Sequence, residues 1–442
     1  MASIAISEAQ GSSSDHQVRS LRIRENMAWT LFGNAIYMGC QWGVLVTAVK
    51  LGTPEMVGQL SLGYAICAPI FLLAQLRLRA ASATDARYEY GSADYLALRV
   101  VCTLGALLCL AAICIFGQFS WVTASIVMGV AVAKAIESGS DVLYGLSQNV
   151  ERMHSIAYSM ILRGCLSLAG FYVVLARTHR IFPAVCALCI AWGVVLVAYD
   201  LPQAAKLIHK VEGVQIHLRW NWPVLRNLAW ITAPLGISSM LTAFAVNIPR
   251  YFIEHMLGPR ELGIFAALGY LTIAGGVIVN SLSEATVPRF AKYFVQGYRY
   301  NANKLLLWLV LITAALGAIG VIGSMMFGRV ILTVVYRSEY AQVPDLLVLL
   351  MWSAALANIS SIFNYVLLAA RRFGMHLASL IVLTVMIAAT CAVAIPRWGV
   401  QGAAFGCLIG FAGQLVACSG AVWWMMKSSD RQIVKQSKAV EV

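Results

Sequence analysis

The chain has 442 residues, of which 60% are hydrophobic and 12% are charged, and its mean hydropathy is +0.77. Soluble domains carry about 25% charged residues, so this composition excludes a soluble protein and predicts an integral membrane protein. The formal net charge is +13. Basic residues gather in the cytoplasmic loops of membrane proteins, so we infer no nucleic-acid partner from this charge.

The first 26 residues are polar, rich in serine and basic at their end, which predicts a disordered cytoplasmic tail (1–26) without a cleavable signal peptide. Twelve apolar runs follow. Each is about 20 residues long, the length that a membrane-spanning helix needs, whereas barrel strands would show shorter alternating segments. We therefore predict an all-α polytopic membrane protein with transmembrane helices at 27–49, 57–76, 98–117, 121–147, 156–176, 181–199, 223–247, 262–283, 304–327, 343–369, 376–395 and 399–426.

A polar stretch divides these twelve helices into two halves of six. Two similar segments support a duplication: LGTPEMVGQLSLGY begins at Leu51, LGPRELGIFAALGY begins at Leu257, and they share six identities in fourteen positions. Because six is an even number, both halves enter the membrane from the same side, and we expect two parallel-duplicated six-helix lobes. The expected divisions after the N-terminal tail are the N-lobe at 27–199, a cytoplasmic linker at 200–222, the C-lobe at 223–427 and a cytoplasmic tail at 428–442.

The distribution of Lys and Arg predicts the orientation. With the N-terminus inside, the inner segments hold 22 of these residues and the outer loops hold 8. Basic residues are more frequent in cytoplasmic loops, so both termini and the linker are expected in the cytoplasm. The remaining two, Lys134 and Arg163, lie within predicted spans.

The fourth span carries a polar stripe on an otherwise apolar helix. At helical spacing its members fall within an arc of about 100°, so the stripe must face protein or water rather than lipid. It can be a structural ion pair that fixes helix packing, or a lumen-facing site for substrate or protons. The members are Lys134, Glu137, Ser138, Asp141, Gly145 and Gln148.

Other spans carry polar residues as well. Arg163 suits a phosphate group through its forked donors, although it could also extend to the inner membrane surface. Arg250 shares a face with Asn247 and Glu254, so either a ligand-binding role or an Arg–Glu pair fits its place. Uncharged stripes are most often ordinary interhelical contacts. The remaining candidates are Asn34, Tyr37 and Gln41 in the first span, Asn280 and Glu284 in the eighth, and Asn358, Ser361 and Tyr365 in the tenth.

Motifs of soluble enzymes are missing from the sequence. It contains no GxxxxGK[ST] loop, so we expect neither direct ATP drive nor enzymatic activity from this chain. Cys186 and Cys189 form a CxxC inside an apolar span, where small buried side chains are more common than metal ligands. We therefore predict no cofactor and no metal.

Three segments resemble a known family: LGTPEMVGQLSLGYAICAPIFLL, LRLRAASATDARYEYGSADYLALR and NIPRYFIEHMLGPRELGIFAALGYL. They are similar to the polysaccharide-transporter branch of the multidrug/oligosaccharidyl-lipid/polysaccharide exporter superfamily, which includes O-antigen and capsule flippases of bacterial inner membranes. The resemblance runs from about residue 27 to 427. It implies two six-helix lobes around a central cavity and the movement of an undecaprenyl-diphosphate-linked oligosaccharide by alternating access.

The resemblance also implies roles and partners. Lys134, Arg163 and Arg250 are the candidates for binding the anionic head group, and Asn34 and Gln41 are further candidates for substrate binding. Membrane lipids, a polysaccharide polymerase and glycosyltransferases are the expected partners. The candidates for proton or cation coupling are Glu137, Asp141 and Glu284.

Two other functions stay open at this point. A drug/cation antiporter of the same superfamily would rely on buried carboxylates, often in the first or tenth helix, and the sequence has none in 27–49 or 346–369. A membrane scaffold that assembles glycan enzymes without transport would have no use for the charged stripe in the fourth span.

Overall fold

The structure is a computed structural model, and it describes residues 23–84, 90–117, 119–150, 152–212, 218–296, 298–336 and 339–440. Most of the predicted tail 1–26 and part of the linker 200–222 therefore lie outside the described residues. The helices of the first part of the chain are α2 (Ile23–Leu51), α3 (Pro54–Gln75), α4 (Leu78–Thr84), α5 (Ser92–Phe116), α6 (Trp121–Asn149), α7 (Met153–Thr178), α8 (Ile181–Val195), the π-helix η1 (Leu196–Asp200) and α9 (Leu201–Glu212). The second part has α10 (Trp222–Leu257), α11 (Pro259–Leu271), α12 (Ile273–Gln296), α13 (Arg299–Val335), the 3-10 helix η2 (Tyr340–Gln342), α14 (Pro344–Ala369) and α15 (Phe373–Val440).

The predicted all-helical membrane fold is confirmed, whereas the number of spans is supported only in part. Among the described residues, 9 helices are long and apolar enough to cross a membrane, or 10 if α11 and the first part of α12 form one bent span. The first predicted span lies in α2, which is not among them. Two predicted spans lie in α15, which has non-helical backbone angles at Gly399 and contains Pro396.

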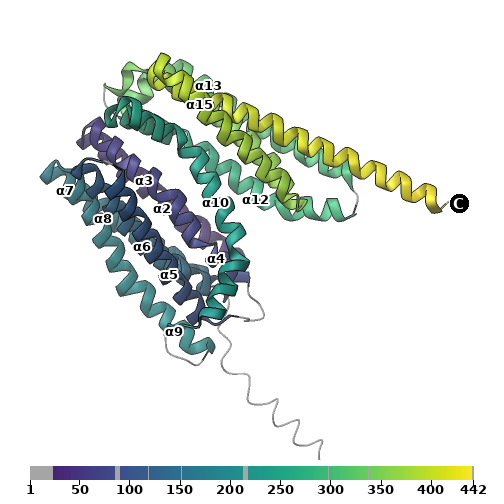
Figure 1. Cartoon of the computed structure of the whole chain (residues 1–442), viewed down its shortest axis with the longest axis horizontal. Coiled ribbons are helices and arrows are strands. Elements are labelled where there is room, and N and C mark those ends of the chain that lie inside the picture. Colours follow the sequence, from purple (N-terminus) through teal and green to yellow (C-terminus); the bar gives the residue numbers. More distant parts are fainter. Residues whose placement is uncertain are drawn as a thin grey trace, which may run out of the picture. The chain divides into compact units, whose positions relative to one another are not determined.

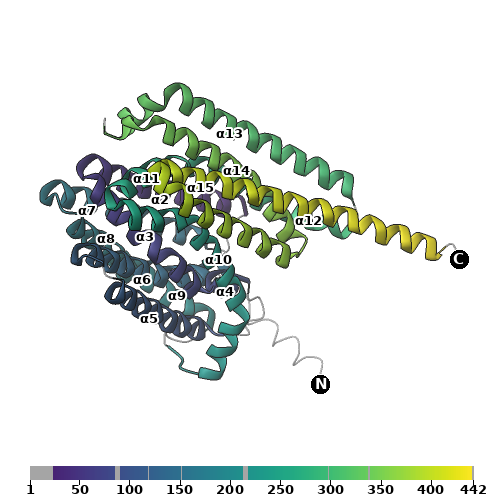
Figure 2. The same ribbon diagram turned by 45° about the horizontal axis from the view of Figure 1, so that its top comes forward.

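The chain divides into two compact units. Unit 1 comprises Met1–Val44 and Ile70–Met240, and unit 2 comprises Leu45–Pro69 and Leu241–Val442. Within unit 1, α6 lies beside α5 and α8 (Figure 1). Within unit 2, α14 lies between α13 and α15 (Figure 2). The units differ from the two sequence halves because α2, α3 and α10 each contribute to both of them.

The stretch expected as a polar linker begins as a helix. The π-helix η1 joins α8 to α9, and α9 is amphipathic. Its buried face carries Ala204, Leu207 and Ile208, while Lys206 and Lys210 are exposed. A π-helix changes the phase of the side chains that follow it, and such segments occur often at functional sites. Here it turns Asp200 into the interior of unit 1.

The two similar segments contact each other in unit 2. Pro54 and Pro259 occupy the first positions of α3 and α11, where proline is well tolerated, and a glycine follows four residues after each. A Cβ added to Gly58 would overlap the carbonyl oxygen of Pro259, and a Cβ added to Gly263 would overlap that of Pro54. The contact is therefore reciprocal, and it brings the backbones of the two copies together at positions that are one residue out of the ungapped alignment.

Candidate functional site

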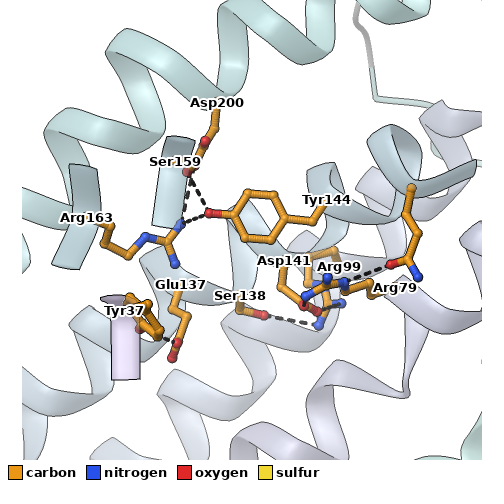
Figure 3. A network of polar contacts seen from close by, with 11 residues as sticks. Tyr37, Arg79, Arg99, Glu137, Ser138, Asp141, Tyr144, Ser159, Arg163 and Asp200 are labelled. Carbon is orange, nitrogen blue, oxygen red and sulfur yellow. Dashed lines mark hydrogen bonds and ion pairs between the residues drawn. The ribbon is translucent and has the colours of Figure 1, made fainter. Parts of the chain in front are cut away.

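Helix α6 positions the polar stripe. Its N-terminus is capped by Ser120, whose side chain accepts a hydrogen bond from the Thr123 amide at 3.2 Å. The stripe residues face the neighbouring helices of unit 1, so the expectation that they face protein or water rather than lipid agrees with the contacts that follow. Figure 3 shows these contacts as a network of side chains from several helices.

Lys134 and Glu137 form the ion pair that their spacing predicts. The Lys134 Nζ lies 2.6 Å from the Glu137 Oε2, and the Tyr37 hydroxyl of α2 donates to the Glu137 Oε1 at 3.0 Å. The two charged side chains are 25% and 21% exposed, so neither is fully removed from the surface. This geometry fits both a structural pair and a site that an ion or ligand can reach.

Arg163 has a different environment from the one expected. It is buried, and its guanidinium lies 3.3 Å from the carboxylate of Asp200 and donates to the Tyr144 hydroxyl at 2.9 Å. Tyr144 in turn lies 2.6 Å from the hydroxyl of Ser159 (Figure 3). In this conformation Arg163 therefore neither extends to the membrane surface nor offers a free guanidinium to a ligand.

Trp192 connects these two ion pairs. Its indole is fully buried in α8, and its centroid is 5.9 Å from the Lys134 Nζ and 5.7 Å from the Arg163 guanidinium carbon. Cations are attracted to the face of an indole, more strongly where water is excluded. The aromatic ring thus contacts a cation of each ion pair.

A third group surrounds Asp141. Its Oδ2 lies 3.1 Å from Arg99 Nη2, and its Oδ1 lies 3.6 Å from Arg79 Nη1. Arg99 is buried and also donates to the hydroxyl of Ser138 at 3.1 Å. The guanidinium of Arg79 lies over the ring of Tyr144, 5.4 Å from its centroid, which links this group to the Arg163 pair.

The linked groups form one charged network inside unit 1. Its four cations face three carboxylates, a net charge of +1: Arg79, Arg99, Lys134 and Arg163 against Glu137, Asp141 and Asp200. Charges inside a membrane protein are costly and usually mark pathways for ions or polar substrates. The network can hold an anion at its partly exposed members, while its buried members fix the helices.

Other candidates belong to unit 2. Arg250 donates to Asn247 at 2.9 Å and lies 5.7 Å from the centroid of the Tyr270 ring. The expected Arg250–Glu254 pair is not among the ion pairs of the described residues, and the Glu254 Oε2 is buried without a hydrogen-bond partner. Glu284 is exposed and accepts from the Tyr365 hydroxyl at 3.2 Å.

The remaining polar candidates are in α2. Asn34 is exposed, while Gln41 is half-buried and has a buried amide nitrogen without a hydrogen-bond partner. In the described part of the chain, no group of three or more His, Cys, Asp or Glu side chains could hold a metal ion.

Several members of the network are not evident from the sequence. Asp200 stands at the boundary of an apolar span and a polar stretch, within the predicted linker 200–222. Arg79 and Arg99 belong to the predicted inner segments by their basic charge, although Arg99 also falls within the predicted span 98–117. An ionisable residue inside a predicted span was the signal that could have identified Arg99.

Comparisons with known sequences identify relatives of the chain. The family model described as "Polysaccharide biosynthesis protein" matches residues 23–294. The capsular polysaccharide biosynthesis protein CapF of Staphylococcus aureus is 27% identical over 384 residues, which cover 86% of this chain and 94% of that protein.

Solved structures share the fold. A multidrug resistance MATE family transporter of the MOP superfamily, in an inward-facing conformation, has a TM-score of 0.70 at 15% identity and covers 91% of this chain and 98% of its own. The lipid II flippase MurJ, in an inward closed conformation, has a TM-score of 0.70 at 11% identity and covers 89% of this chain and 87% of its own. At these identities the likeness establishes the fold and leaves the substrate open.

Proposed function

Since the chain belongs to the family of polysaccharide biosynthesis proteins, we propose that it flips a lipid-linked oligosaccharide across the bacterial inner membrane for the export of a surface polysaccharide. The observation that carries this proposal is the match to that family on a fold shared with transporters, the lipid II flippase MurJ among them. The proposed lipid is of the undecaprenyl-diphosphate type, and the proposed mechanism is alternating access.

The charged network supports a polar, anionic substrate. A diphosphate and its sugars cannot cross the hydrocarbon core without polar partners, whereas a prenyl chain can stay in lipid. The network has one more cation than carboxylates and is partly exposed at Lys134, Glu137 and Asp141. Binding of an anion there would therefore relieve an excess of positive charge.

The proposed roles follow from how far each side chain is exposed in this structure. We assign Lys134 and Arg250 to the head group and keep Asn34 and Gln41 as further candidates for substrate binding. Arg163 could bind a ligand only after it parts from Asp200, so it is a candidate for another conformation of the cycle. For coupling to protons or cations we propose Glu137, Asp141 and Glu284.

The proposed topology has twelve transmembrane helices in two six-helix lobes and both termini in the cytoplasm. Reporter fusions that are active only inside or only outside the cell test it. Fusions at residues 205 and 435 should both read as inside, because the basic residues concentrate in the inner segments. An outside reading at either residue would refute both the topology and the parallel duplication.

Deletion of the gene tests the function itself. We expect loss of a surface polysaccharide together with accumulation of its lipid-linked oligosaccharide, and both should revert when the wild-type gene is restored. The measurements are surface polysaccharide by immunoblot and lipid-linked sugar by mass spectrometry of lipid extracts. Normal polysaccharide combined with increased sensitivity to cationic drugs would instead support the antiporter, and normal polysaccharide without a drug effect would reject transport of either kind.

A further inference from the structure

The turn between α3 and α4 has an uncommon backbone. The two residues that separate these helices, Leu76 and Arg77, have φ angles of 48° and 53°. The left-handed region is unfavourable for residues other than glycine, and two such residues in succession persist only where the surroundings hold them. Leu76 is buried in a hydrophobic cluster of unit 1, which holds the turn on that side.

Two arginine side chains, one in the turn and one in α4, contact neighbouring helices. Arg77 is exposed and its Nε donates to the Ser239 hydroxyl at 3.1 Å, while the Arg79 Nε donates to the side-chain oxygen of Gln148 at 3.3 Å. Helix α4 lies close to α6, because a Cβ added to Gly145 would be 3.1 Å from the Cα of Arg79. This packing fixes the backbone from which the Arg79 side chain extends, two residues after Arg77.

Among the described residues, the arginines at this turn outnumber the carboxylates that pair with them. Asp141 is the carboxylate that contacts Arg79, but it lies closer to the buried Arg99, at 3.1 Å compared with 3.6 Å. Among the residues that the structure describes, no carboxylate is within ion-pair distance of Arg77. Arg79 and Arg99 therefore share one carboxylate, and among the described residues Arg77 has the neutral Ser239 hydroxyl as its partner.

We propose that Arg77 and Arg79 form a binding site for the diphosphate head group of the lipid-linked substrate; this inference rests on the proposed function. The forked donors of arginine match phosphoryl oxygens, and each guanidinium can bind one phosphoryl group through two hydrogen bonds. Arg79 exchanges its long contact to Asp141 for the ligand, while Asp141 keeps its shorter contact to Arg99. The strained turn holds the two arginines in place before the ligand arrives.

The place of the site directly after α3 suits a lipid head group. The apolar part of α3 ends at Gln75, and the arginines follow within four residues. Apolar helices end where the head-group region of a bilayer begins, so a diphosphate attached to a prenyl chain can reach both arginines while its chain stays in the hydrocarbon. In the proposed topology this end of α3 is cytoplasmic.

A binding measurement on the full-length protein in nanodiscs tests the site. The probes are undecaprenyl diphosphate, undecaprenol and inorganic pyrophosphate, and the variants are Arg77→Gln, Arg79→Gln and the double variant. The matched control is Arg371→Gln/Arg372→Gln. It removes two consecutive exposed arginines at the α14–α15 turn, where Arg371 is also left-handed with a φ of 56°.

We expect wild-type protein and the control to bind undecaprenyl diphosphate equally, and the double variant to bind it about 10- to 100-fold more weakly, because charge-assisted hydrogen bonds are lost. Each single variant should lose part of this affinity, which keeps the test valid if the double variant does not fold. Competition by pyrophosphate would show that the diphosphate alone suffices, whereas a need for the whole lipid would show that the chain contributes; both support the site.

The outcomes that contradict the site can be distinguished from those that contradict the proposed function. If wild-type protein binds undecaprenyl diphosphate and every Arg77 and Arg79 variant that folds binds it equally well, the site is wrong and the proposed function stands. Equal binding of undecaprenol by wild-type protein would also refute the site, because recognition would not involve phosphate. If wild-type protein binds neither lipid, the proposed function fails together with the site.

Discussion

Replacement of Asp200 by alanine is expected to destabilise the protein by about 3–5 kcal/mol, because it leaves the charge of Arg163 buried without its carboxylate. The side chains of Arg163 and Asp200 are only 3% and 2% exposed, so water cannot replace the missing partner. The expected result is a strong loss of protein from the membrane and a lower thermal unfolding midpoint after purification.

Two variants control this prediction. Arg163→Met/Asp200→Leu removes both charges and should recover most of the abundance, because a buried ion pair can often be replaced by apolar side chains. Glu137→Ala breaks the partly exposed pair with Lys134 and should cost less, about 1 kcal/mol, because its side chains are 21% and 25% exposed. An Asp200→Ala protein as abundant and stable as wild type would show that the Arg163 pair does not hold unit 1 together.

Gly58→Ala and Gly263→Ala should each destabilise the protein by about 1–3 kcal/mol or more, because the added methyl group meets a backbone carbonyl oxygen that has no rotamer to change. The reciprocal contact predicts that the two variants behave alike. The measurement is the unfolding midpoint of the purified proteins, together with their abundance in membranes.

Gly269→Ala is the matched control for these two variants. Gly269 lies in α11, as Gly263 does, but a Cβ added there meets nothing within 4 Å. Since alanine favours a helix more than glycine does, this variant should be as stable as wild type or slightly more stable. If Gly263→Ala and Gly269→Ala were equally well tolerated, the two copies of the repeated segment would not pack by their backbones.

Much of the helical arrangement was predictable, because long apolar runs have few alternatives to a membrane helix. The stripe on α6 was predictable from helical spacing, which alone places Lys134 beside Glu137. The structure confirms that pair. Local periodicity carries this kind of information within one helix. The family resemblance is confirmed as well, through the match over residues 23–294.

Partners from different helices were not predictable in the same way. Asp200 faces Arg163 only because η1 interrupts the regular spacing at the end of α8, and a hydropathy pattern does not reveal a π-helix. The repeated segments indicated equivalent positions, but their similarity carried no information that Gly58 and Gly263 lie in one contact. Such contacts depend on packing between helices, which the sequence of one chain does not encode by spacing.

The structural role of Arg163 changes how the proposed transport is understood. The buried Arg163–Asp200 pair joins α7 to η1, whereas the proposed substrate contacts are cations nearer the surface. Stability is thereby assigned to this pair, and substrate recognition is proposed for Arg79 of the same network and for Arg77 beside it. Abundance and export should accordingly respond to different substitutions, at Asp200 in the first case and at Arg77 and Arg79 in the second.

The proposed flipping is tested most directly by measuring in which leaflet the lipid-linked oligosaccharide lies. In spheroplasts of a polymerase-deficient strain, a membrane-impermeant periodate reagent should oxidise this oligosaccharide when the protein is present and leave it intact when the gene is deleted. We expect the wild-type gene to restore oxidation in the deletion strain. Equal oxidation with and without the protein would contradict the proposed flipping, because the substrate would then reach the outer leaflet by another route.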